Sequence, residues 1–191
     1  MPGEPFTMFD KTLRAAVAMH TGPTVYLLDG GNDPELLTLC NEIGAVHVNC
    51  RDVAGAKAGK INYCLRNYSK SPFVLVLDPD HIPEIDMLER VLPPFEDPKV
   101  GFVQIVQAYY NQHKTMVAHG AAEQTYGFYG PLMMALDGLD MPIAIGANCT
   151  FRRTAFDSIG GHAEHLAEDA CTSMRLHAAG WKSRYVPHRG S

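Results

Sequence analysis

Short, mostly apolar runs alternate along the chain with segments in which apolar residues recur at helical spacing. The runs are typical of strands buried inside a sheet, and they predict strands at residues 24–28, 46–48, 73–77, 100–106, 142–145 and 183–186. The helical spacing predicts helices at 6–19, 33–43, 58–68, 85–92, 119–136 and 168–179, and a brief helix within 148–156. Strands that alternate with helices indicate a three-layer α/β domain with a mostly parallel central sheet.

Local signals define the ends of the second helix. Asp33 is placed to cap its first turn, Pro34 takes its first position, and Gly44 is a typical stop. Residues 51–59 are polar and contain glycine, so they are predicted to form a loop. One face of the helix at 119–136 is typical of a core face, with a substrate platform as the alternative; it carries Tyr126, Tyr129 and Met133.

Length and composition favour a single soluble domain over residues 1–191. The net charge is −5 and no basic stripe is present, so nucleic acid is not an expected partner. No apolar run approaches the ~20 residues that cross a bilayer. The five cysteines are scattered and are expected to be reduced, mostly buried thiols, as in the cytosol: Cys40, Cys50, Cys64, Cys149 and Cys171.

The strand at 73–77 leads into two aspartates, Asp78 and Asp80. Ligands bind at the carboxyl ends of strands in an open α/β sheet, and extended residues i and i+2 point the same way, about 6–7 Å apart along the chain. Two carboxylates at one point indicate a Mg²⁺ or Mn²⁺ site that also binds a nucleotide diphosphate. The alternative is a plain turn, because Pro79 presets φ and aspartates cap backbone amides.

Three further groups at strand ends or helix starts carry candidate chemistry. Asp29 follows a strand in a glycine-containing turn and is placed either to accept from a nucleotide base or ribose, or only to stabilise the turn. Lys57 precedes a helix start, where a cation and backbone amides suit a phosphate, with a solvated lysine as the alternative. Glu168 and Asp169 open the last long helix, either as a cap or as a proton acceptor opposite a metal-bound leaving group.

An ordered set of motifs spans nearly the whole chain and resembles one family. The set resembles the catalytic domain of the cellulose-synthase-like glycosyltransferases of family 2, and its members are LDGG (28–31), AKAGKIN (56–62), VLDPDH (76–81), FVQ (102–104), GANCTFRR (146–153), GGHAEHLAED (160–169) and LHAAGWKSRYV (176–186).

The resemblance implies a GT-A fold and a role for each candidate residue. It implies that Asp29, Lys57 and Asp78 bind the uridine diphosphate part of a UDP-sugar, and that Asp80, with Asp78, binds Mg²⁺ or Mn²⁺. Asp169, beside Glu168, would be the general base that deprotonates a glycan acceptor. The implied reaction is an inverting single displacement, with UDP-glucose as the expected donor. Residues of about 1–110 would bind the nucleotide, and about 111–191 the acceptor and the base.

The sequence also departs from the family pattern. Leu28 stands where a second aspartate is frequent, and Ala167 replaces a threonine. A first strand before the helix at 6–19 and a Gln-x-x-Arg-Trp motif are missing. We therefore expect a truncated catalytic core that binds its UDP-sugar weakly with Mn²⁺ and transfers sugar poorly or not at all. The full-length protein is expected to carry transmembrane helices and to act at the cytoplasmic face of the cell membrane.

Two other interpretations stay open at this stage. VLDPDH is similar to the strand-end motif of haloacid-dehalogenase-type phosphohydrolases, in which Asp78 would be the nucleophile. That family requires a threonine two residues after the second aspartate, and Ile82 stands there. The other interpretation is a domain that binds a nucleotide without catalysing a reaction.

Overall fold

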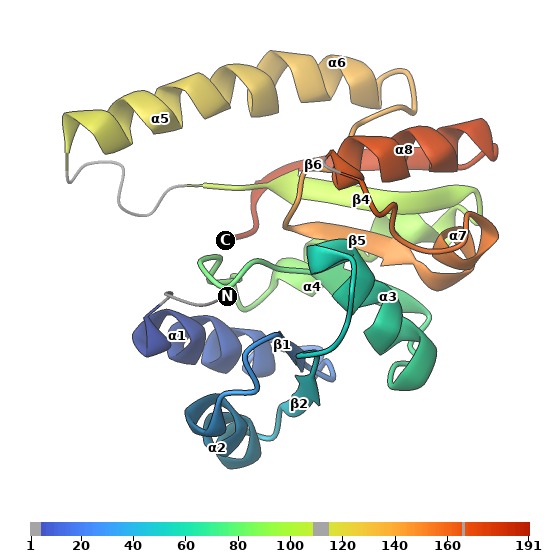
Figure 1. Cartoon of the computed structure of the whole chain (residues 1–191). Helices are drawn as coiled ribbons and strands as arrows, with labels where there is room; N and C mark the ends of the chain where they lie inside the picture. The colour runs from blue at the N-terminus through green and yellow to red at the C-terminus, as the bar shows by residue number, and fades with distance from the viewer. Residues whose placement is uncertain (1–4, 109–114, 166) are drawn as a thin grey trace.

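A computed structural model describes residues 5–108, 115–165 and 167–191. Helices and strands alternate through most of the chain (Figure 1). Their order is α1 (Phe6–Val17), β1 (Tyr26–Asp29), α2 (Pro34–Ile43), β2 (Val46–Asn49), α3 (Ala56–Asn67), β3 (Phe73–Val76), α4 (Met87–Val91), η1 (Pro93–Glu96), β4 (Val100–Val106), α5 (Met116–Gly127), η2 (Phe128–Leu132), α6 (Met133–Asp137), β5 (Cys149–Arg152), α7 (Arg153–Ser158), α8 (Glu168–Ala178) and β6 (Lys182–Arg189).

The strands form two sheets. β1 and β2 pair in parallel, and the second sheet has the order β3-β5-β4-β6. β4 and β6 are parallel, but β5 runs antiparallel to both of its neighbours. The expectation of a mostly parallel sheet is therefore wrong for β5, and the larger sheet is mixed. The strand predicted at 142–145 is also wrong, because that segment is irregular and the strand forms at Cys149–Arg152.

The end signals of α2 are confirmed. The Asp33 carboxylate accepts a hydrogen bond from the Glu35 amide at 2.8 Å, and Gly44 has a left-handed φ of 78°. The predicted loop over 51–59 is wrong in its second half, because α3 begins at Ala56. Gly55 and Ala56 both have positive φ, so the chain enters this helix through a sharp turn that the sequence pattern conceals.

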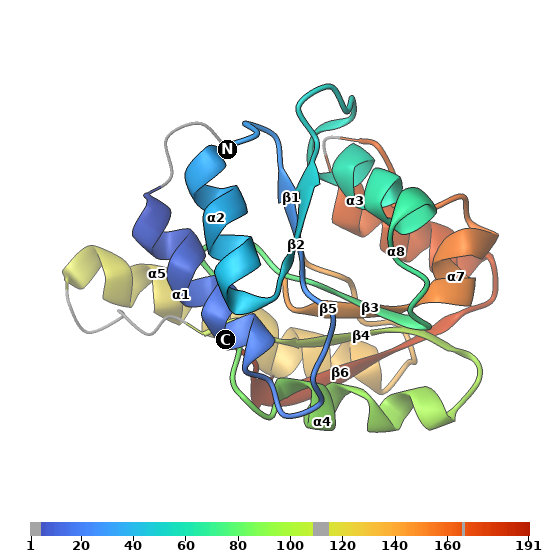
Figure 2. The ribbon, with the colours of Figure 1, turned by 90° about the horizontal axis from the view of Figure 1, so that it is seen from below.

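Two apolar clusters cover opposite faces of the larger sheet. One cluster joins α4 and η1 to Val103 and Ile105 of β4, and the other joins α3, α7 and α8 to Phe102 of the same strand. Figure 2 shows α3, α7 and α8 on one side of β3–β6 and α4 on the other. This arrangement confirms the predicted three-layer α/β architecture, and β4 lies at its centre, buried along almost its whole length.

The segment α5–η2–α6 forms a long, nearly continuous helix, as predicted (Figure 1). Tyr129 and Met133 are buried against Tyr185 of β6, whereas Tyr126 is partly exposed. Most of the predicted stripe is therefore core. Within the described part of the chain, no helix has both the length and the apolar character required to cross a bilayer.

A cavity of about 600 Å³ lies between β1 and β3, which do not pair. It is lined by apolar residues of α1 and α3 as well as by the two strands. β1 and β3 are therefore only partly buried, in contrast to β4. The expectation that a first strand is missing ahead of α1 is not tested by the described residues, which begin at residue 5, and it stays a prediction.

Candidate functional site

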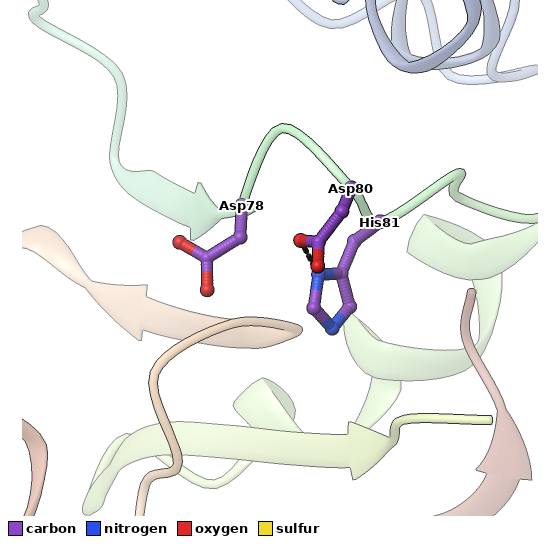
Figure 3. A group of neighbouring side chains, drawn as sticks. All are labelled: Asp78, Asp80 and His81. Carbon is purple, nitrogen blue, oxygen red and sulfur yellow. Dashed lines mark hydrogen bonds and ion pairs between the residues drawn. The ribbon is translucent and has the colours of Figure 1, made fainter. Parts of the chain in front are cut away.

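The turn after β3 brings Asp78, Asp80 and His81 together. β3 ends at Val76, and the His81 amide donates to the Asp78 carbonyl at 3.0 Å, which closes a tight turn. One ligand atom from each of the three side chains lies within 4.8 Å of the other two (Figure 3). The turn therefore brings the two aspartate side chains together. Their proximity was predicted, but the reason given for it, an extended backbone through both residues, is wrong.

The donor set of this turn fits a hard divalent cation. Carboxylate oxygens are preferred by Mg²⁺ and Mn²⁺, and an imidazole nitrogen is acceptable to Mn²⁺. Asp80 has a largely exposed side chain, 63%, and its Oδ1 lies 2.8 Å from Nδ1 of His81. Asp78 is less exposed, at 33%. Asp80 is therefore the more accessible of the two carboxylates and pairs with its neighbour in the same turn, while Asp78 has a partner from another element.

That partner is Lys57, in the first turn of α3. Its Nζ donates to Asp78 Oδ1 at 2.5 Å and to the Gly146 carbonyl at 2.6 Å. The ion pair balances the charge of Asp78 and links α3, β3 and the loop before β5. Lys57 thus lies beside Asp78, with a carboxylate as its partner in this structure, and its contact with a phosphate stays a prediction.

Gly146 marks the point at which the site converges. A Cβ atom placed on Gly146 would lie 3.4 Å from Asp169 Oδ2, 3.9 Å from Asp78 Oδ2 and 3.9 Å from Lys57 Nζ. Gly146 has a φ of 46°, in the region that favours glycine. Side chains separated by more than a hundred residues in sequence therefore surround one small space.

Asp169 lies in the first turn of α8, where its surroundings raise its pKa above the ordinary value of an aspartate. Burial raises its pKa, and the charges of Glu168 and Asp78 raise it further, while Lys57 and the Gly146 amide oppose the rise. Ala167 stands at the N-cap position of α8, and among the described residues no side-chain capping hydrogen bond is made there. A carboxylate with a raised pKa, close to a charged cluster, has the chemistry of a proton acceptor.

Asp29 has a different environment. It is 6% exposed, and its oxygens accept from the amides of Gly31 at 2.7 Å and Asp33 at 2.6 Å. His47 Nε2 lies 3.0 Å from Asp29 Oδ2. Burial alone would raise the pKa of Asp29, but the hydrogen bonds from His47 and the two amides lower it below its usual range. In this structure Asp29 stabilises the turn after β1, and the contacts described for its carboxylate do not include Lys57 or Asp169.

Sequence reasoning missed several residues of the site. His81 was quoted in a motif without a role, and Gln104, in the FVQ motif, proves to brace the loop that carries Gly146. The buried Gln104 amide donates to the Ala147 carbonyl at 3.0 Å, and its Oε1 accepts from the Ile145 amide at 2.9 Å. A polar residue within an apolar strand is the sequence signal for this role, because a buried polar side chain usually has a hydrogen-bond partner.

Comparison with known proteins decides the family. The sequence profile described as "Glycosyltransferase like family 2" matches residues 7–190. The chain belongs to this family. The resemblance recognised from the motifs is therefore confirmed.

Curated family 2 relatives include two bacterial cellulose synthases. The chain is 32% identical over 170 residues to the "Cellulose synthase catalytic subunit [UDP-forming]" of Komagataeibacter sucrofermentans, covering 85% of this chain and 22% of that protein. It is 30% identical over 192 residues to the protein of the same name from Xanthomonas axonopodis pv. citri, covering 96% of this chain and 26% of that protein. The chain thus spans about a quarter of the length of these relatives.

Solved structures share the fold. The mannosyltransferase PcManGT of Pyrobaculum calidifontis, in complex with GDP-Man and Mn²⁺, has a TM-score of 0.70 at 18% identity, over 96% of this chain and 52% of that one. The glucosyl-3-phosphoglycerate synthase of Mycobacterium tuberculosis, in complex with Mn²⁺, UDP-Glc and glycerol 3-phosphate, has a TM-score of 0.61 at 14% identity, over 95% of this chain and 68% of that one. The family 2 chain therefore has the predicted GT-A fold.

Proposed function

We propose that this domain transfers a sugar from a UDP-sugar to a glycan acceptor by an inverting single displacement. The observation that carries the proposal is the convergence of Asp78, Lys57 and Asp169 around Gly146. A site of this kind needs a group that binds the leaving diphosphate and, across a short space, a base for the acceptor. The turn after β3 and the start of α8 supply these two groups.

The donor side of the proposal rests on Asp78, Asp80 and Lys57. A Mg²⁺ or Mn²⁺ ion bound at Asp80 and Asp78 would neutralise the charge that develops on the diphosphate. Lys57 would exchange part of its contact with Asp78 for a phosphate oxygen. UDP-glucose is the donor we favour, because the curated relatives are named as UDP-forming cellulose synthases. Asp29 would contribute by shaping the turn near the nucleotide.

The acceptor side rests on Asp169. Its carboxylate would accept the proton of an acceptor hydroxyl as that oxygen bonds to the anomeric carbon and the bond to the diphosphate breaks. Glu168 would act by raising the pKa of Asp169, which makes Asp169 a better proton acceptor. Attack and departure on opposite faces of the sugar give inversion. The glycan acceptor and a membrane location for a longer protein belong to this proposal as well.

Release of UDP from UDP-glucose in the presence of Mn²⁺ and a glucan acceptor tests the proposal. The assay uses this chain and any longer polypeptide that contains it. Removal of a general base lowers turnover by about 10²–10⁴-fold, which is the loss we expect for Asp169→Asn. Asp157→Asn is the matched control, because Asp157 is an exposed aspartate of α7 that pairs with Arg153. Equal turnover of Asp169→Asn and wild type would contradict the proposal, and a phosphoaspartate trapped on Asp78 would replace it with the phosphohydrolase reading.

A further inference from the structure

His162 is a buried histidine to which the proposed reaction assigns no role. It lies in the loop between α7 and α8, is 3% exposed, and its ring packs near Phe151 and Phe156. Asn62 of α3 fixes its backbone: the His162 amide donates to Asn62 Oδ1 at 2.7 Å, and Asn62 Nδ2 donates to the His162 carbonyl at 2.9 Å. The ring is therefore held in one place by a neighbouring helix as well as by its packing.

The two ring nitrogens of His162 face different partners. Nδ1 lies 3.1 Å from Thr172 Oγ1, and Nε2 lies 3.6 Å from Asp169 Oδ1. Thr172 Oγ1 already accepts the Ala163 amide at 3.0 Å, so its hydroxyl proton is available to donate to Nδ1. A histidine that accepts at Nδ1 carries its own proton on Nε2. Burial, the largest influence on this ring, lowers the pKa of His162 and favours its neutral form; a backbone hydrogen bond with Ala163 and the charge of Glu168 oppose this shift, and the net direction is still downward.

The two oxygens of Asp169 are thereby distinguished. Oδ1 faces the Nε2 atom of His162, whereas Oδ2 is the oxygen that lies 3.4 Å from the Cβ position of Gly146, in the space shared with Asp78 and Lys57. A separation of 3.6 Å is long for a hydrogen bond, and catalytic contacts are commonly long until substrate is bound.

We propose that His162 is a positioning residue for Asp169, and that its Nε2–H holds Oδ1 so that Oδ2 faces the acceptor hydroxyl. The proposal rests on the proposed function of Asp169 as a base. His162 does not take the proton itself; it fixes the orientation of the carboxylate by adding a side-chain donor to the backbone hydrogen bond that Asp169 makes with Gly146.

Three variants test this role through kcat and KM for UDP-glucose. His162→Phe keeps an aromatic ring but removes the donor, and we expect kcat to fall by about 10–100-fold, the loss typical of outer-shell partners, with KM within about twofold. His162→Gln places an amide donor near the position of Nε2 and should recover a substantial part of kcat. His177→Phe is the control: His177 Nε2 lies 2.9 Å from Ser183 Oγ, at the opposite end of α8. Wild-type kcat in His162→Phe, or equal losses in His162→Phe and His177→Phe, would overturn the proposal.

A second measurement does not depend on turnover, and its first part, the tautomer of His162, uses the wild-type chain alone. Long-range ¹H–¹⁵N correlations of the histidine rings in the wild-type chain should show His162 as the neutral tautomer with its proton on Nε2, and Asp169→Asn should shift that nitrogen. A proton on Nδ1, or an Nε2 resonance unaffected by Asp169→Asn, would refute the contact. If neither this chain nor a longer polypeptide that contains it releases UDP, the proposed function fails, and these spectra still decide the relation between His162 and Asp169.

Discussion

Replacement of Asp29 by alanine should destabilise the fold more than it weakens nucleotide binding. The carboxylate accepts from the Gly31 and Asp33 amides and from His47, and all three contacts disappear in Asp29→Ala. Each buried donor left unsatisfied costs about 1–3 kcal/mol. The turn lies near the surface, so water can replace part of the loss at the two amides, and we expect a total of about 3 kcal/mol.

Chemical and thermal denaturation measure this loss. For a chain of this size, about 3 kcal/mol corresponds to a decrease in Tm of roughly 6–12 °C. Asp33→Ala is the comparison, because that side chain accepts one hydrogen bond at the start of α2, and loss of such a cap costs about 0.5–2 kcal/mol. Asp29→Ala should therefore be the more destabilised of the two.

The pH dependence of stability tests the direction in which folding shifts the pKa of Asp29. The pKa of Asp29 is lowered in the folded state, so its carboxylate stabilises the fold above the pKa of the unfolded chain, and this stabilisation is lost as the pH falls through the folded-state value. The difference in stability between wild type and Asp29→Ala should shrink in acid. One buried donor without a partner would cost at least about 1 kcal/mol. If the free energy of unfolding of Asp29→Ala stays within about 1 kcal/mol of the wild-type value and UDP binding is lost, Asp29 is a ligand contact. The structural role argued for it is then refuted.

Three further predictions concern the loop that closes the site and the charges around it. Gly146→Ala should cost about 1–2 kcal/mol of left-handed strain and raise KM, because its methyl group enters the space beside Asp169; unchanged KM would contradict the convergence of the site. Gln104→Leu should cost about 2–4 kcal/mol, because it leaves buried loop groups unpaired, and a wild-type Tm would show that the loop does not need this brace. The kcat of the transferase should fall as the pH falls through the raised pKa of Asp169, since only the carboxylate accepts a proton. Lys57→Met removes a cation that lowers that pKa, so this limb should move to higher pH, and an unmoved limb would argue against Asp169 as the base.

Most helices and strands are predicted correctly from the sequence where their local signals agree with the final packing. The capped α2, the apolar run of β4 and the long helix α5–η2–α6 each follow from patterns that tertiary contacts do not override. β5 was missed because it is short and follows Asn148, a residue with a positive φ of 57°. A strand of this kind is defined by its antiparallel partners, β3 and β4, and not by its own sequence.

The acidic residues of the candidate site could be predicted from the sequence, but the residues that hold them in place could not. Asp78, Asp80 and Asp169 were predicted because strand ends and helix starts are where such chemistry is expected; the structure places Asp80 beside Asp78, and both Asp78 and Asp169 beside Gly146, while their roles stay predictions. The bond from Lys57 to the Gly146 carbonyl joins residues 89 positions apart, and nothing in the local sequence of either residue signals it. His162 is similar, because a lone histidine in a loop carries no signal until Asn62 and Thr172 are seen around it.

Calorimetry of UDP binding tests whether the turn after β3 forms a site for a metal ion and a diphosphate. UDP is titrated into wild type, Asp80→Asn and Asp169→Asn, each with and without Mn²⁺. We expect that the heat of UDP binding requires Mn²⁺, is lost in Asp80→Asn and is retained in Asp169→Asn. Equal heats for wild type and Asp80→Asn, or binding that is indifferent to Mn²⁺, would contradict it.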